Sequence, residues 1–154
     1  MIFANLVILN SPIFLFTQSI ITNCINLLMQ YIEAGIEPAF NAMVRTQWAN
    51  VQTPVGPCAY VTQLREHLQL IFPFIRDNLQ DSRRHFAQLC NTFASNFTAK
   101  FLKCLFKCKP LKETAAEQLL HDTHTLKKVL LGLPGHQSDI KTAPTNYTKT
   151  IVKG

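Results

Sequence analysis

The sequence predicts an all-α protein. Apolar residues recur at alternating spacings of three and four along most of the chain, which is the pattern of helices that bury one face. Prolines and glycines interrupt this pattern where helices would begin or end, and no convincing alternation of apolar and polar residues indicates a strand. The 154 residues correspond to the length of one domain, so we expect one helical region, over residues 16–135.

The first helical pattern begins at residue 16. Its apolar positions are Phe16, Ile20, Cys24, Leu27, Leu28 and Tyr31. We expect this helix to end near Gly35. A second, short helix is expected to follow Pro38, because proline suits the first position of a helix.

Residues 1–15 form an apolar segment that we leave unassigned. The segment lacks the basic start and the small-residue cleavage site of a signal peptide. Asn10, Ser11 and Pro12 interrupt it before the roughly 20 apolar residues of a membrane span, and uncharged polar residues recur between positions 13 and 32. We therefore expect a buried helix, or a first segment that results from a wrong start site.

Two further helices are predicted in the middle of the chain. After a loop at residues 52–57, a pattern that begins near Ala59 carries Val61, Leu64, Leu68 and Ile71, and Pro73 should kink or divide this helix. The clearest pattern then predicts one long helix over residues 81–108. Its apolar stripe covers about 80° of the circumference and consists of Phe86, Cys90, Phe93, Phe97, Phe101, Cys104 and Cys108.

The last predicted helix follows Pro110, which ends the long one. Thr114 and Glu117 match a capping box, in which the hydroxyl and the carboxylate bind free N–H groups of the first turn. This helix should run to about Leu131 and end at Gly132. Residues 136–154 are polar and are expected to be irregular, leading to a downstream helix that the chain lacks.

The composition excludes common classes of enzyme and nucleotide-binding protein. The five glycines form neither of the glycine-rich loops that hold dinucleotides or triphosphates. The nucleophile motif of α/β-hydrolases and the zinc motif of metalloproteases do not occur either. No nucleophile, base and orienting group can be assembled with specificity, so we expect a protein that is not an enzyme and uses no cofactor.

Positive charge is concentrated on the predicted long helix. Fifteen basic against nine acidic residues give a net charge of +6, and Lys100, Lys103 and Lys107 lie opposite the aromatic stripe. Such a face can be solvated, or it can contact an anionic membrane or a partner protein. Nucleic acid is not expected as a partner, because the aromatic rings do not stand among the lysines as stacking platforms. These three lysines are our candidate membrane or partner face.

One spacing resembles a metal site. Cys104, Cys108, His121 and His124 nearly match a two-cysteine, two-histidine zinc finger. The cysteines continue a helical apolar stripe, however, and a new helix begins between the two pairs, so we predict no metal site. All five cysteines are expected to be buried free thiols of a reducing compartment.

Two other groups of titratable residues are predicted to lie on solvated helix faces. Glu117, His121 and His124 form one of them. Asp77, Asp81 and His85 are spaced one turn apart and form the other, with an ion pair four residues apart.

The second half of the chain resembles one protein family. The matching strings are residues 74–79 (FIRDNL), 105–110 (LFKCKP), 116–120 (AEQLL), 122–124 (DTH), 126–127, 129–131, 133–134, 141–144, 147–149 and 152–154. Gln47 and Trp48 with Val51, and residues 60–62, resemble it as well. The family is that of vacuolar protein sorting-associated protein 53, a subunit of the Golgi-associated retrograde protein (GARP) tethering complex.

This resemblance implies a segment from the C-terminal part of a larger, rod-like helical subunit, an antiparallel bundle of the type found in multisubunit tethers. It implies sister tether subunits as partners, with SNARE or small GTPase proteins and the membrane surface as further contacts. The expected location is the cytosolic face of the trans-Golgi network and of endosomes, where a sister assembly acts in recycling. The chain would then be a fragment or an incomplete gene product. The competing hypothesis is a small basic helical module that binds a membrane or nucleic acid directly.

Overall fold

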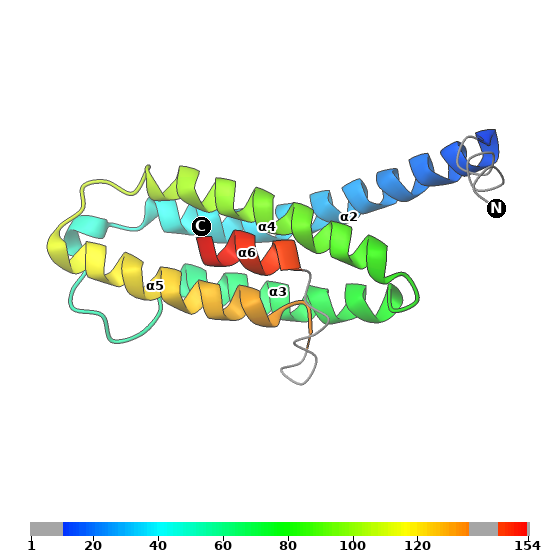
Figure 1. Cartoon of the computed structure of the whole chain (residues 1–154). Coiled ribbons are helices and arrows are strands. Elements are labelled where there is room, and N and C mark those ends of the chain that lie inside the picture. The colour runs from blue at the N-terminus through cyan, green and yellow to red at the C-terminus, as the bar shows by residue number, and fades with distance from the viewer. Residues whose placement is uncertain (1–10, 136–144, 154) are drawn as a thin grey trace.

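A computed structural model describes residues 11–135 and 145–153, and this part of the chain is helical without a strand (Figure 1). The elements are α2 (Pro12–Arg45), a 3-10 turn η1 (Trp48–Asn50), α3 (Ala59–Asn78), α4 (Arg83–Leu105), α5 (Glu113–Gly132) and α6 (Thr145–Lys153). The all-α prediction is confirmed.

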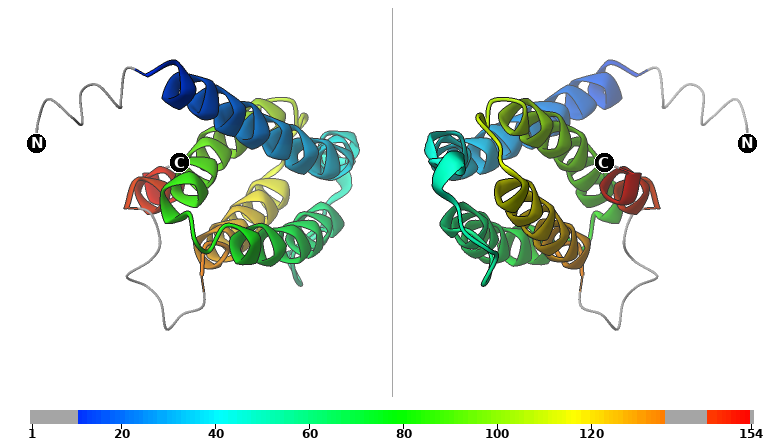
Figure 2. Two further views of the ribbon diagram at one scale, coloured as in Figure 1. Left: turned by 90° about the vertical axis from the view of Figure 1, so that its right-hand side faces the viewer. Right: turned by 90° about the vertical axis from the view of Figure 1, so that its left-hand side faces the viewer.

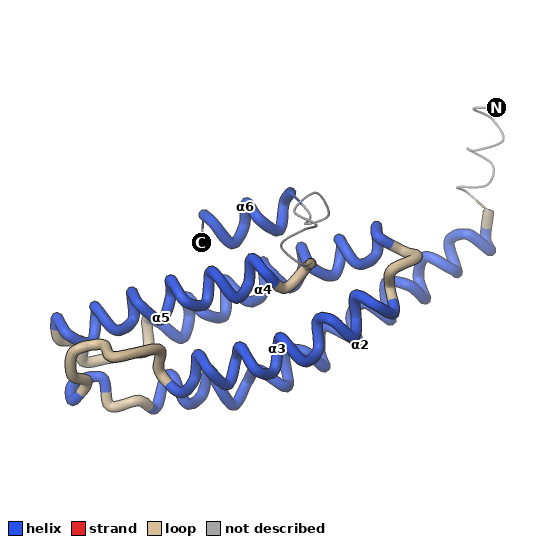
Figure 3. The backbone as a smooth tube through the Cα atoms, turned by 90° about the horizontal axis from the view of Figure 1, so that it is seen from below, coloured by secondary structure: helices blue, strands red, loops and turns tan. Residues whose placement is uncertain are grey.

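The five helices of the described residues form a ring in which each helix packs mainly against two others. The order around the ring is α3, α2, α4, α6, α5 and back to α3, which the views along the bundle show (Figure 2). Helices that follow each other in the sequence run in opposite directions (Figures 1 and 3). The bundle is therefore antiparallel between successive helices, whereas α2, α4 and α6 run the same way.

The core lies inside this ring and contains the aromatic stripe of α4. All seven predicted stripe residues are buried. The ring of Phe97 lies 5.3 Å from that of Phe40 on α2, and the ring of Phe93 lies 4.9 Å from that of Phe72 on α3. The stripe therefore joins three helices. α4 ends at Leu105, about one turn before the predicted end, and Cys108 is buried in the segment that follows.

α2 is one helix of 34 residues, so the predicted end near Gly35 and the separate helix after Pro38 are both wrong. Buried residues on either side of Pro38, including Ile36 and Phe40, hold the helix against its neighbours. Packing of this seam offsets the backbone hydrogen bond that a proline removes. Gly35 does not end the helix. It leaves space for the imidazole of His67, which lies so close that a Cβ at position 35 would overlap it.

α2 begins at Pro12, inside the segment that we left unassigned. Ser11 caps the helix, because its Oγ accepts a hydrogen bond from the N–H of Phe14 at 3.1 Å, and proline suits the following position. The boundary after residue 15 therefore falls within a helix. The first turns of α2 are not buried, so the expected buried helix is wrong for residues 12–24. Residues 1–10 lie outside the described part.

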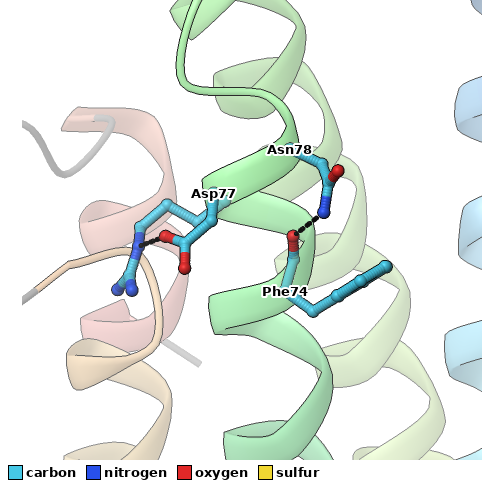
Figure 4. A network of polar contacts seen from close by, with 4 residues as sticks. Phe74, Asp77 and Asn78 are labelled. Carbon is cyan, nitrogen blue, oxygen red and sulfur yellow. Dashed lines mark hydrogen bonds and ion pairs between the residues drawn. The ribbon is translucent and has the colours of Figure 1, made fainter.

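α3 carries the predicted apolar face and continues through Pro73 without division. Val61, Leu64 and Leu68 are buried. In the last turn, the side-chain amide of Asn78 donates a hydrogen bond to the carbonyl of Phe74 at 2.8 Å (Figure 4).

Asp77, Asp81 and His85 do not share a helix face, and that prediction is wrong. α3 ends before Asp81, and His85 belongs to α4. Asp77 instead forms an ion pair with its neighbour Arg76, with 3.1 Å between Oδ1 and Nε (Figure 4).

The predicted capping box of α5 is not formed. The helix begins at Glu113, so Lys112 takes the N-cap position predicted for Thr114, and no side chain caps the helix. The hydroxyl of Thr114 donates to the carbonyl of Val51 at 3.0 Å, so it ties the start of α5 to the chain after η1. A tertiary hydrogen bond thus replaces the local one. The helix ends at Gly132, as predicted.

Residues 145–153 form α6, and the prediction of an irregular segment is wrong for them. Tyr147 and Ile151 lie one turn apart and are both buried. The hydroxyl of Tyr147 donates to the carbonyl of Leu130, which fixes α6 against α5. The rest of the predicted irregular segment, residues 136–144, lies outside the described part.

Candidate partner-docking groove

The predicted basic face borders a groove of about 590 Å³ between α2 and α4. α4 contributes Lys100 and Lys103 to it, and Lys107 follows in the turn after α4. The two helices run parallel here, so each turn of α4 faces one turn of α2 along the groove (Figure 1). The charged side chains that α2 contributes are Glu33, Glu37 and Arg45.

Two polar contacts close one end of this groove. The side-chain amide of Asn96 donates to Oε1 of Glu33 at 2.7 Å, and one turn further Lys100 pairs with Glu37. The ammonium group of Lys100 also lies 5.7 Å from the centre of the Phe40 ring, within the range of a cation–π contact. Both helices advance by four residues between the two contacts, so the contacts set the register of α4 on α2. Lys100 is therefore engaged within the bundle.

The other end of the groove carries positive charge without an acidic partner. Within residues 11–135 and 145–153, Arg45, Lys103 and Lys107 form no ion pair. Lys103 and Lys107 are exposed. Both helices end here, and the negative ends of their dipoles favour the cations without neutralising them. This end of the groove is suited to an anionic group of a partner.

The lysine spacing predicted only part of this groove. Lys103 and Lys107 are exposed, whereas Lys100 pairs with Glu37. Their role as a membrane or partner face stays a prediction. The contribution of α2 was not predicted. One signal was present: Glu33 and Glu37 are four residues apart, as are Asn96 and Lys100, so two polar pairs of equal spacing could meet across parallel helices.

A second polar cluster, which spacing did not predict, is buried at the start of α3. Oδ1 of Asp122 on α5 accepts hydrogen bonds from the N–H of Cys58 at 3.0 Å and from the side-chain amide of Gln118 at 2.9 Å. Gln118 also donates to the carbonyl of Gly56 at 2.9 Å. The cluster therefore fastens the loop before α3 to α5. Burial, and then the charge of Asp122, raises the pKa of the Tyr60 hydroxyl.

The thiols differ from the prediction at two positions. Cys90, Cys104 and Cys108 are buried, whereas Cys24 is exposed and Cys58 is half-buried. Burial raises the pKa of Cys90 to about 12, and burial together with Asp122 raises that of Cys58 to about 12. These two thiols are poor nucleophiles at neutral pH, because the thiolate is the reactive form.

The histidines and the cysteines of the zinc-like spacing differ in solvent exposure. His121 and His124 are exposed on α5 with Glu117, as predicted, whereas the two cysteines are buried. In the part of the chain that the structure describes, no three histidine, cysteine or acidic side chains are arranged to hold a metal ion.

Comparison with known proteins relates the chain to one family. It is 34% identical over 134 residues, which is 86% of its length, to the vacuolar protein sorting-associated protein 53 homolog of Caenorhabditis elegans. The chain belongs to the vacuolar protein sorting-associated protein 53 family. It is also 26% identical over 134 residues to vacuolar protein sorting-associated protein 53 A of Arabidopsis thaliana.

This vacuolar protein sorting-associated protein 53 segment spans 17% and 16% of the lengths of those two relatives. The resemblance seen in the sequence is confirmed. No protein-family model matches the chain, and no solved structure matches it significantly.

Among the residues that the structure describes, one helix is long and apolar enough to cross a membrane by length and composition. It is α2, whose most apolar window has a mean hydropathy of 1.4 and is 11% buried. Core helices of soluble proteins and signal sequences share these properties, so a single such helix does not by itself indicate a membrane span.

Proposed function

We propose that the chain is part of a non-enzymatic subunit of a vesicle-tethering complex. The complex acts in retrograde transport from endosomes to the trans-Golgi network and in endosomal recycling, on the cytosolic face of these membranes. Membership in the vacuolar protein sorting-associated protein 53 family is the observation that carries this proposal. Because the chain spans about a sixth of its relatives, the activity belongs to the longer protein, and this segment supplies one helical part of it.

Within this role, the open end of the groove between α2 and α4 receives an acidic segment of a sister subunit. Arg45, Lys103 and Lys107 supply the positive charge. The groove is concave. It lies between two helices whose register is set by the polar contacts between them. A concave site fits a protruding side chain better than it fits the flat surface of a membrane. SNARE and small GTPase proteins are further partners of the assembled complex.

The competing hypothesis, a basic module that binds nucleic acid or a membrane directly, is less well supported. Proteins that bind single strands stack bases on aromatic side chains in a basic groove. Here Phe97 and Phe101 are buried on the side of α4 away from the lysines. Nucleic-acid binding also predicts a steep loss of affinity with salt, since it releases counterions.

The test is co-purification of the full-length protein that contains this segment, washed at low and at moderate salt. We expect sister tether subunits at both salt concentrations and localisation to the trans-Golgi network and endosomes. The variant Lys103→Glu/Lys107→Glu should reduce this recovery. The control Lys149→Glu/Lys153→Glu makes the same charge change on exposed positions of α6 and should leave it unchanged.

The outcomes separate the two levels of the proposal. If sister subunits are recovered equally with the groove variant and with wild type, the tether role stands and the groove has no part in it. If only nucleic acid is recovered, and is lost as salt rises, the tether role itself is wrong.

A further inference from the structure

The connection between α4 and α5 combines positive charge with exposed apolar side chains. It comprises residues 106–112 (FKCKPLK) and is here called the basic loop. Its lysines, Lys107, Lys109 and Lys112, are exposed and form no ion pair with any residue that the structure describes. No acidic residue occurs in the sequence from position 82 to position 112. Even with Glu113, which begins α5, the loop keeps a net positive charge.

The packing of Cys108 decides which side chains of the basic loop face water. Its thiol is fully buried and donates a hydrogen bond to the carbonyl of Met43 on α2 at 3.8 Å. The N–H groups of residues 106–108 donate to carbonyls of the last turn of α4. These contacts hold the centre of the loop against the bundle and leave apolar side chains on both sides of it in water. The exposed fractions of Phe106 and Leu111 are 74% and 45%.

The shape and the composition of the basic loop suit a lipid surface. The loop is convex, because it joins two antiparallel helices at one end of the bundle (Figure 1). Segments that lie on membranes place Lys or Arg at the headgroups and Phe or Leu at the boundary of the acyl chains. Each lysine near an anionic leaflet strengthens binding about fivefold, and burial of a phenyl ring adds about tenfold. The apolar centre of a protein interface, in contrast, is poor in charged residues.

We propose that the basic loop binds the surface of anionic membranes. Phe106 and Leu111 enter the headgroup region, and the lysines lie at the lipid phosphates. The inference rests on the proposed tether role for the identity of the membrane, because it gives the subunit a point of attachment to the cytosolic leaflet. The loop shares Lys107 with the groove between α2 and α4. The experiments therefore change only Phe106, Lys109 and Lys112.

The first test is flotation of the full-length protein that contains this segment with lipid vesicles. We expect binding to vesicles of phosphatidylcholine with phosphatidylserine, and much weaker binding to phosphatidylcholine alone. Phe106→Ala should weaken binding to the anionic vesicles about tenfold. The control Phe74→Ala removes a similarly exposed ring, at 71%, from α3 toward the opposite end of the bundle, and should leave binding unchanged (Figures 1 and 4). Equal binding by the two variants would overturn the proposal.

The lysines are tested by Lys109→Glu/Lys112→Glu, which should weaken binding to the same vesicles by at least about 25-fold, or fivefold for each lysine. The control Lys149→Glu/Lys153→Glu makes the same charge change on α6 and should leave binding nearly unchanged. Circular dichroism checks that all variants stay helical.

Recovery of sister subunits, measured on the same variants, separates this proposal from the tether role. If the loop variants keep vesicle binding and lose sister subunits, a protein is the occupant of the loop and the proposal is wrong. If they lose vesicle binding while the wild-type protein recovers no sister subunits, the membrane contact stands and the tether role is wrong.

A second measurement shows whether the loop enters the lipid. The chain has a single tryptophan, Trp48, which is buried. Phe106→Trp adds an exposed one, whose fluorescence should shift to shorter wavelength with phosphatidylserine-containing vesicles and be quenched by brominated acyl chains. Phe74→Trp should show neither change. A Phe106→Trp spectrum that the vesicles leave unchanged would show that this side chain stays in water, and would overturn the proposal.

Discussion

At the scale of single residues, Asp122 holds together segments that are distant in the sequence. Its carboxylate is fully buried and accepts hydrogen bonds from the backbone of Cys58 and from Gln118, and Gln118 in turn binds the carbonyl of Gly56. A buried donor that loses its acceptor costs about 1–3 kcal/mol, because it has left water without a replacement. Asp122 and Gln118 together therefore hold the loop before α3 against α5.

We expect Asp122→Ala to lower the free energy of unfolding by about 2 kcal/mol or more, since it leaves two donors without an acceptor. Urea denaturation measures this change. Glu117→Ala removes an exposed carboxylate from the same helix and should change stability by less than about 0.5 kcal/mol. Similar losses in the two variants would mean that the hydrogen bonds of Asp122 do not stabilise the fold.

At the scale of elements, α4 and α2 show two different relations between spacing and burial. The single apolar stripe of α4 points into the ring, and its aromatic members contact α2 and α3. α2 has two apolar stripes: the predicted one, between Phe16 and Tyr31, is largely exposed, and the one between Ile25 and Phe40 is buried. Periodicity predicts that a helix has an apolar face, but it does not say which of two faces the rest of the bundle covers.

The assignment of faces on α4 is tested by two substitutions only two residues apart. Phe101→Ala should cost about 3–5 kcal/mol of stability, through lost burial and the cavity that remains. Lys103→Ala changes an exposed side chain and should cost less than about 0.5 kcal/mol. The melting temperatures of the two variants provide the comparison. Equal melting temperatures would show that the faces have been assigned wrongly.

At the scale of the whole molecule, α6 closes the ring of helices. It lies between α4 and α5, and Tyr147 and Ile151 are its buried contacts. Without α6, the apolar sides of α4 and α5 at this point would face water. A helix of nine residues is not stable by itself, so its formation depends on this packing.

Tyr147→Ala should therefore release α6 and lower the free energy of unfolding by about 3–5 kcal/mol, the usual cost of removing a buried aromatic side chain. Hydrogen exchange followed by mass spectrometry should show faster exchange across residues 145–153. Val152→Ala affects the exposed side of the same helix and serves as the control. Protection of these amides in the Tyr147 variant would show that other contacts hold α6.

The sequence by itself determined the fold class, the aromatic stripe of α4 from Phe86 to Cys104, the helix after residue 59 and the family of the chain. These features depend on local periodicity or on identity of residues, both of which can be read directly. Two lysines of the groove, Lys100 and Lys103, could also be read, because they share one face of α4.

Only the tertiary structure decided which face of α2 is buried, that α2 continues through Pro38, and that residues 145–153 fold as a helix. It also decided that Lys100 pairs with Glu37 and that Thr114 binds the carbonyl of Val51. In each case the deciding interaction joins residues far apart in the chain. Packing and hydrogen bonds across such distances override local signals. The free energy that a proline, a capping motif or the weak propensity of a short polar helix contributes is no larger than that of the tertiary contacts that oppose it.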